Sequence, residues 1–208
     1  MYADSASVLL DSIQAPDELT DKDFAHWCML CGKVTDEAAT GLLPIYQWQR
    51  AQQWFTEHGT AEEQAQIDLY LGRAYVEDGE YDKAMQIYAD ALQLAKEHQA
   101  YNVAGYICAY MADLYGFRDI TSECLKKREE ACEFFKKAEN YKSYAYSLKD
   151  LAGEWAILDS FACTIPLLQK ADSISQLLHN KNLTAAIANA FALIYEMQGK
   201  YNEAETAY

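Results

Sequence analysis

Two cysteines near the N-terminus form the motif most suggestive of chemistry, Trp27-Cys28-x-x-Cys31, with His26 directly before it. A Trp-Cys-x-x-Cys sequence is typical of thioredoxin-like redox sites, where the first cysteine begins a helix after a strand and the helix dipole lowers its pKa. A zinc site would instead need four ligands, usually including a second closely spaced pair. The surrounding residues predict that both cysteines lie in the middle of a helix, and the other four cysteines stand apart. We therefore expect them to pack as small hydrophobic residues, with neither a metal nor a cofactor.

Histidines and paired acids are the next candidates for acid–base chemistry. His58 and His98 lie 40 positions apart, each at the expected end of a helix, and His179 is one residue past the same place. There an imidazolium interacts favourably with the helix dipole and the free carbonyls, which needs no catalytic role. Glu62 and Glu63 are adjacent and point in different directions on a helix, so they form no facing carboxylate pair. Phosphate-loop, Gly-x-Ser-x-Gly and His-Glu-x-x-His motifs are missing from the sequence. The sequence predicts a protein that is not an enzyme.

Composition limits both the fold and the partners. The 208 residues are 51% hydrophobic and 13% aromatic, with only three prolines and nine glycines, which favours long helices over a turn-rich β fold. A formal net charge of −15 would repel phosphate backbones and anionic lipids. We therefore expect no binding of nucleic acid and no direct membrane contact by this segment. The sequence has no run of apolar residues long enough to span a bilayer, and its first residues do not have the pattern of a signal peptide.

An internal repeat organises the elements that would position any site. When the chain is shifted by 40 residues, small residues fall on small residues and aromatic residues on aromatic ones. The position of Gly72 reads Gly32, Gly72, Ala112, Ala152 and Ala192, and the position of Tyr75 reads Tyr75, Tyr115, Trp155 and Tyr195. Small residues at fixed positions allow two helix backbones to approach closely, while the aromatic residues fill the space beside them.

Each repeat is expected to contain two helices. Gly79 is a helix stop, and Thr60-x-x-Glu63 and Thr20-x-x-Asp23 are capping boxes that begin helices. The predicted helices span residues 5–13, 21–36, 41–58, 61–78, 81–98, 101–116, 121–138, 141–157, 160–179, 182–198 and 201–208. The predicted organisation is a lead-in at 1–20 and a repeat domain at 21–208, with units at about 21–60, 61–100, 101–140, 141–181 and a truncated 182–208. The expected fold class is all-α, an α-α superhelix formed as a right-handed solenoid of antiparallel helix pairs.

The second unit carries a family resemblance. Its residues Leu71-Gly72-x-x-Tyr75-x-x-x-Gly79-x-Tyr81-x-x-Ala84-x-x-x-Tyr88-x-x-Ala91 resemble a complete tetratricopeptide repeat (TPR) signature, in which only the leading tryptophan is missing and is replaced by Asp68. The usual period of that family is about 34 residues, so the longer repeat here implies longer helices.

A narrower resemblance concerns the kind of TPR protein. The runs SASVLLDSI, DKDFAHWCMLC, YLGRAYVEDGEYDKAM and FFKKAENYKSYAYSLKDLA resemble a bacterial group whose repeat domain is exported and often lipid-anchored. This resemblance implies the exported side of the bacterial cell envelope, which is the compartment we favour. Six apparently unpaired cysteines are more typical of a reducing interior, so the cytoplasm is the alternative. Because the last unit stops within its second helix, we expect the natural chain to continue.

The TPR resemblance also implies where binding occurs, because the first helix of each pair lines the concave face in that family. The positions that the family uses to clamp a peptide carboxylate read Leu69, Arg73, Ala109 and Asp113, so that clamp is absent. Tyrosines gather at the other groove positions, and tyrosine is common in interface hot spots, although some of these residues could instead belong to the core between repeats. The predicted partner-binding residues are Tyr70, Arg73, Tyr106, Tyr110, Asp113, Phe117, Tyr146, Lys149 and Asn189.

Three functions follow from this reading. The first is a scaffold that binds a protein or peptide in the groove. The second is a ligand-sensing domain that controls a C-terminal output module, for which a closed pocket is expected. An enzyme built on Cys28 and Cys31 is the third. The sequence does not fix the oligomeric state, and pairing through the open C-terminal edge is one possibility.

Overall fold

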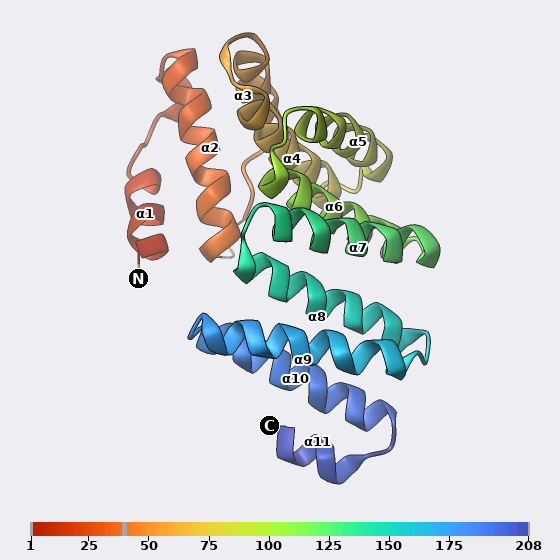
Figure 1. Ribbon diagram of the computed structural model, residues 1–208. Helices are drawn as coiled ribbons and strands as arrows, with labels where there is room; N and C mark the ends of the chain where they lie inside the picture. The colour runs from red at the N-terminus through yellow and green to blue at the C-terminus, as the bar shows by residue number, and fades with distance from the viewer. Residues whose placement is uncertain (1, 39–40, 208) are drawn as a thin grey trace. The chain divides into compact units, whose positions relative to one another are not determined.

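The computed structural model in Figure 1 describes residues 2–38 and 41–207. In this part of the chain the regular elements are helices and strands do not occur, as the sequence predicts. In chain order they are α1 (Tyr2–Asp11), the short 3₁₀ helix η1 (Pro16–Glu18), α2 (Asp21–Ala38), α3 (Ile45–His58), α4 (Ala61–Glu77), α5 (Tyr81–Glu97), α6 (Tyr101–Phe117), α7 (Thr121–Lys137), α8 (Tyr141–Ile157), α9 (Phe161–Leu177), α10 (Lys181–Met197) and α11 (Tyr201–Ala207).

The predicted helix positions are confirmed to within a few residues. The largest differences lie at the N-terminal end, where α1 begins at Tyr2 rather than at residue 5 and α3 begins at Ile45 rather than at residue 41. Pro44 caps α3 with extended backbone, and the residue before a proline disfavours helical backbone, so the helix starts after it. No pattern in the sequence analysis predicted η1. None of the described helices is both long and apolar enough to cross a membrane.

A single type of turn ends each of the helices from α4 to α10. After α4, Gly79 has a φ of +79°, its N–H donates to the carbonyl of Val76 (3.1 Å) and the N–H of Glu80 donates to the carbonyl of Tyr75 (2.9 Å). These are the two hydrogen bonds of a Schellman motif, so the predicted stop at Gly79 is confirmed. The left-handed residue of these turns is Gly79, Gln99, Asp119, Glu139, Asp159, His179 or Gly199.

Helix starts are also encoded locally. The Thr60 hydroxyl accepts a hydrogen bond from the N–H of Glu63 at 3.2 Å, and the Glu63 carboxylate accepts one from the N–H of Thr60 at 2.9 Å, which confirms the capping box. At the start of α2 the Thr20 hydroxyl accepts a hydrogen bond from the N–H of Asp23 at 3.2 Å and donates to the Asp23 carboxylate at 2.8 Å. Asn140 and Asn180 add side-chain caps to α8 and α10.

The chain divides into two compact units, residues 1–107 and 108–208. In the first unit, α2 to α5 enclose large fully buried side chains, among them Phe24, Trp48, Phe55 and Tyr88. Arg50 of α3 fastens the lead-in segment, because its guanidinium donates to Asp21 (2.8 Å) and to the carbonyl of Leu19 (3.2 Å) and lies over the Phe24 ring.

In the second unit, successive helices pack against one another, as α8, α9, α10 and α11 show in Figure 1. One buried cluster is formed by Ala152 and Ala156 of α8, Leu168 of α9 and Ile194 of α10. The small residues lie where α8 meets α9, and the repeat pattern predicts that small residues allow such close packing of two helices. The unit boundary falls within α6, whose residues from Cys108 onward belong to the second unit.

Candidate functional site

The first helix of each pair carries the predicted partner-binding residues, and in the first unit the structure divides them. Tyr70 of α4 has 0% of its surface exposed; its ring lies 5.3 Å from that of Trp48 and fills the space beside Gly32. Arg73, one turn further along α4, is half-buried with its guanidinium 6.0 Å from the centre of the Tyr70 ring. Tyr106 on α6 is also half-buried. Tyr70 therefore has the burial of a core residue, the alternative that the sequence left open for these tyrosines.

In the second unit the predicted residues lie at the surface of α6, α8 and α10. Phe117, at the end of α6, is 75% exposed, and Asp113 and Asn189 are exposed as well. Tyr110, Tyr146 and Lys149 are half-buried. Six of the predicted residues thus retain accessible surface within one unit, in a mixture of aromatic, charged and amide side chains.

Arg128 of α7, which the sequence analysis did not single out, connects this surface to the interior of the unit. Its Nη2 donates to Asp113 on α6 at 2.7 Å and lies 3.5 Å from the carboxylate of Glu154 on α8. The Arg128 side chain is largely buried, and its Nε atom has no hydrogen-bond partner. Beside it on α8, Lys149 pairs with Asp150. The guanidinium therefore holds α6 and α8 to α7 and fixes the orientation of Asp113.

The Cys28 and Cys31 pair does not have the environment of a redox site. Both residues lie inside α2 with no strand before them, and both are free thiols. Burial raises the pKa of Cys28 well above its ordinary value, with a further contribution from Cys31. Because the thiolate is the reactive form, this position suppresses nucleophilic chemistry. Among the residues that the structure describes, no group of three or more histidine, cysteine and acidic side chains is placed to hold a metal.

His58 takes the structural role at a helix end that the sequence predicts for it. His58, at the end of α3, places its Nδ1 atom 3.1 Å from the carbonyl of Trp54 and stacks its ring on that of Trp54 with centres 5.1 Å apart. His26 places its Nδ1 atom 2.7 Å from the carbonyl of Lys22. The Nδ1 atoms of both rings thus lie within hydrogen-bond distance of carbonyls of their own helices.

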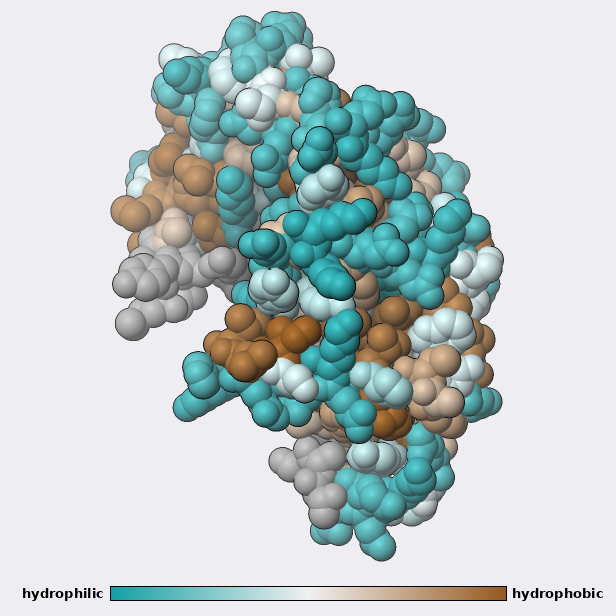
Figure 2. Space-filling view, viewed as in Figure 1, coloured by the Kyte–Doolittle hydropathy of each residue, from teal (hydrophilic) through white to brown (hydrophobic). Residues whose placement is uncertain are grey.

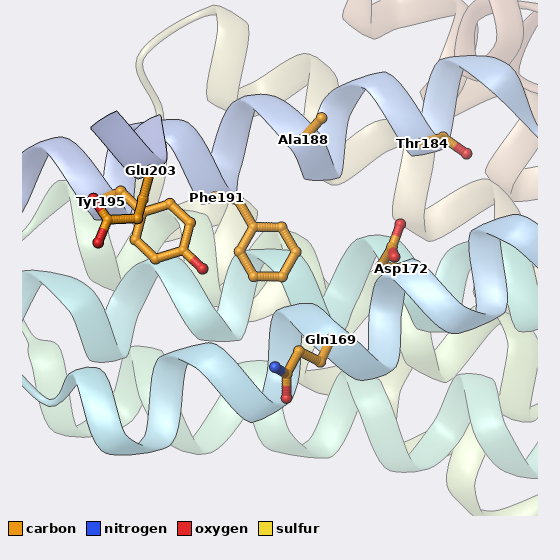
Figure 3. A pocket seen from close by; sticks show the side chains of 7 residues that line it. All are labelled: Gln169, Asp172, Thr184, Ala188, Phe191, Tyr195 and Glu203. Atoms are coloured by element: carbon orange, nitrogen blue, oxygen red, sulfur yellow. The ribbon is translucent and has the colours of Figure 1, made fainter. Parts of the chain in front are cut away.

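A separate hollow lies among α9, α10 and α11 of the second unit, with a volume of about 390 Å³ (Figure 3). Phe191 and Tyr195 of α10 lie side by side in it, with ring centres 6.2 Å apart and planes 22° from parallel. Its lining residues are Gln169, Asp172, Thr184, Ala188, Phe191, Tyr195 and Glu203. The repeat positions in the sequence did not predict this hollow, because its lining residues come from three helices.

Comparison with solved structures gives the fold a context. The chain matches BtubC (BKLC) from P. vanneervenii with a TM-score of 0.72 and 16% identity, over 99% of this chain and 86% of that one. It matches the TPR-like repeats of a kinesin light chain from Podosopora anserina with a TM-score of 0.65 and 14% identity, over 94% and 93% of the two chains. The fold is TPR-like.

A third match is aspartyl phosphate phosphatase F from Bacillus subtilis, with a TM-score of 0.69 and 10% identity, over 91% of this chain and 59% of that one. Identities this low establish the TPR-like fold alone and carry no activity or partner over to this chain. No family model and no curated protein matches the sequence. The predicted fold class, an all-α array of antiparallel helix pairs of TPR type, is confirmed.

Proposed function

We propose that this chain is a non-catalytic scaffold that binds a protein or peptide through the first-helix face of its second unit. That face is formed by α6 from Cys108 onward, α8 and α10. The observation that carries the proposal is the exposure of two large apolar side chains there, Phe117 of α6 at 75% and Leu193 of α10 at 57%. The same two helices also present the polar side chains of Asp113 and Asn189. An exposed apolar anchor surrounded by polar groups is the arrangement of an interface hot spot and its rim.

The two units differ in surface character, which favours the second one as the binding unit. Acidic residues heavily outnumber basic ones in residues 1–107 but only slightly in residues 108–208. Most of the exposed large hydrophobic residues also belong to the second unit. Figure 2 shows a largely hydrophilic surface over α5 and hydrophobic side chains gathered around the C-terminal end of α9, where Leu177 and Leu178 are exposed. A less charged, more apolar surface loses less hydration on binding.

Two further elements of the proposal concern organisation. We propose that the structural unit is a 40-residue helix pair, as the starts of α4, α6, α8 and α10 at Ala61, Tyr101, Tyr141 and Lys181 suggest. The lead-in at 1–20, the unit boundaries, and the likeness to exported bacterial TPR proteins stay predictions. Tyr70 is left out of the proposed surface because it has no accessible area.

A random peptide library displayed on phage and selected on the purified chain tests the proposal. Peptides enriched on the wild-type chain should bind at least tenfold more weakly to Phe117→Ser and Leu193→Ser, because each variant removes an apolar anchor. Tyr201→Ser is the matched control, since Tyr201 is 72% exposed but lies on a second helix, α11. Equal weakening by Tyr201→Ser, or no enrichment at all, would contradict the proposed surface.

A ligand-sensing domain is the second candidate function, and the hollow among α9, α10 and α11 is the observation in its favour. A thermal-shift screen of sugars, nucleotides and amines tests it. A sensor should be stabilised by one chemical class at concentrations near its dissociation constant, and variants of Phe117 or Leu193 should not change that response.

A further inference from the structure

A charged pair in the second unit occupies two positions that hold aromatic or apolar side chains elsewhere in the chain. Arg128 of α7 lies 40 residues after Tyr88 and 40 residues before Leu168, and both of these are 0% exposed. Glu154 of α8 lies 40 residues before Ile194, which is 3% exposed. Replacing a buried ion pair by well-packed apolar residues is often neutral or stabilising, so stability alone gives no reason for charges here. Departures from a local packing pattern are expected where function requires them.

This pair reaches the surface through Asp113 of α6. One nitrogen of Arg128, Nη2, lies 2.7 Å from a carboxylate oxygen of Asp113 and 3.5 Å from one of Glu154. The exposed fraction of the side chain is 13% for Arg128 and 19% for Glu154 but 56% for Asp113. A bound partner therefore meets the carboxylate of Asp113 more readily than the guanidinium that holds it.

Negative charge is in excess around the pair. Burial raises the pKa of Asp113, and the interaction with Arg128 opposes this effect. The negative charges of Asp150 and Glu154 raise the pKa of Asp113 further. Since Lys149 pairs with Asp150, the group contains three carboxylates and two cations. A further cation at this surface would offset the remaining negative charge, and partial burial strengthens that interaction relative to open solvent.

An exposed apolar side chain adjoins the acidic group. On α8 the spacing of Asp150, Gly153, Glu154 and Ile157 places them on one side of the helix. Ile157 is 70% exposed, and a Cβ added to Gly153 would meet nothing within 4 Å. Three further helices of the same unit follow α8. This surface therefore lies inside the unit and offers a partner an apolar contact close to negative charge.

We infer that this surface takes a lysine or arginine side chain of the bound protein segment, while an apolar residue of the same segment covers Ile157. The cation of the partner pairs with Asp113, which Arg128 orients, and the open space over Gly153 admits its side chain. An acidic segment is repelled by the same carboxylates. The inference rests on the proposed function, because it names the chemistry of the segment that the first-helix face binds.

Peptides selected on the full wild-type chain by phage display are the probes that test the inference. They should be richer than the unselected library in lysine or arginine next to an apolar residue. Replacing that arginine by citrulline, or that lysine by norleucine, should weaken binding about fivefold, as expected for a partly exposed charge pair. Fluorescence polarisation at near-physiological salt measures the change, because at low ionic strength the net charge of −15 attracts any cationic peptide.

A double-mutant cycle assigns the effect to Asp113. In Asp113→Asn the same replacement in the peptide should weaken binding less than about twofold, since the partner charge is gone. Glu133→Gln, which changes an exposed acid on α7, is the matched control and should keep the fivefold effect. Circular dichroism of Asp113→Asn should match that of the wild type, because Asp113 is exposed.

The outcomes separate this inference from the proposed function. Suppose that peptides are enriched and depend on Phe117 and Leu193, but carry no excess of basic residues or carry acidic ones instead. The first-helix face then binds as proposed, and the inference is overturned. A basic preference that persists unchanged in Asp113→Asn overturns it as well, because overall charge would then explain the preference. If no peptides are enriched, the proposed function and this inference fail together.

Discussion

The ring of Tyr88 on α5 lies so close to the backbone of Gly72 on α4 that no space remains for a Cβ atom between them. Gly32 on α2 has the same relationship to Tyr70 on α4. The repeat pattern predicts that small residues lie beside aromatic ones, but the aromatic residues that contact these two glycines are Tyr88 and Tyr70 rather than those at the position of Tyr75.

Replacement of this glycine gives the first prediction. Gly72→Ala should lower the free energy of unfolding by about 1–3 kcal/mol, because the added methyl overpacks a buried contact. Chemical denaturation monitored by circular dichroism measures the change. Gly153→Ala on α8 is the matched control: a Cβ there meets nothing within 4 Å, so the variant should be neutral or slightly stabilising. A destabilised Gly153→Ala variant would show that helix geometry, rather than the aromatic contact, sets the cost.

Asp68 on α4 predicts a pH dependence of stability. Burial raises the pKa of this carboxyl to about 6. The negative charge of Asp90 also raises the pKa, whereas a hydrogen bond from Gln52 Nε2 at 2.7 Å lowers it. Since the folded state then holds the proton more tightly than the unfolded state, stability should fall as pH rises from about 4 through 6. Asp68→Asn should remove this slope and stabilise the protein at pH 7 on the order of 2 kcal/mol. Stability measured across this pH range, with exposed Glu57→Gln as the control, checks both statements.

Arg128 predicts a contrast between a buried and an exposed ion pair on one helix. Arg128→Ala leaves Glu154 without its positive partner in a largely buried position, and should cost on the order of 2 kcal/mol of unfolding free energy. Lys126→Ala removes the exposed pair with Glu123 on α7, at 3.9 Å, and should cost less than about 0.5 kcal/mol. Urea denaturation of the two variants compares them directly, and equal losses would mean that Arg128 does not tie α6 and α8 to α7.

The left-handed turn residues predict opposite effects of glycine and alanine. Glu139, with a φ of +56°, has a Cβ in a conformation that glycine adopts at lower cost, so Glu139→Gly should stabilise the chain by up to about 1 kcal/mol. Gly79→Ala, at a φ of +79°, should destabilise it by about 1 kcal/mol or more. Melting temperatures of both variants provide the measurement; a loss of stability in Glu139→Gly would point to a side-chain role for Glu139.

Thiol reactivity separates the cysteines. Cys163 is exposed and should react within seconds to minutes with a disulfide reagent, whereas burial raises the pKa of Cys132 to about 12 and should limit its reaction to unfolding. The number of reactive thiols is measured from the absorbance of the chromophore that the reagent releases, in the native and in the denatured protein. Cys163→Ser should remove the fast phase of this release. A fast phase that persists in this variant would mean that Cys28 or Cys31 is reactive after all.

Local patterns in the sequence determined where the helices lie. Gly79, Thr60 and Thr20 each act through hydrogen bonds to residues at most five positions away, so their effect does not depend on the rest of the fold. The spacing of small and aromatic residues likewise determined that helices pair closely, because an amphipathic helix must bury one face. These signals predicted an all-α fold of paired helices, and the resemblance of residues 71–91 to a tetratricopeptide repeat signature predicted its TPR type.

Only the tertiary structure decided which side chains of a first helix remain accessible. Tyr70 and Tyr110 lie 40 positions apart at the same position of the predicted repeat, yet Tyr70 is fully buried against Trp48 and Tyr110 keeps part of its surface. Burial depends on the neighbour that faces each residue, and that neighbour is far away in the sequence. For the same reason no sequence pattern pointed to Arg128 or to the hollow over Phe191, since both arise where three helices meet and side chains distant in the chain are brought together.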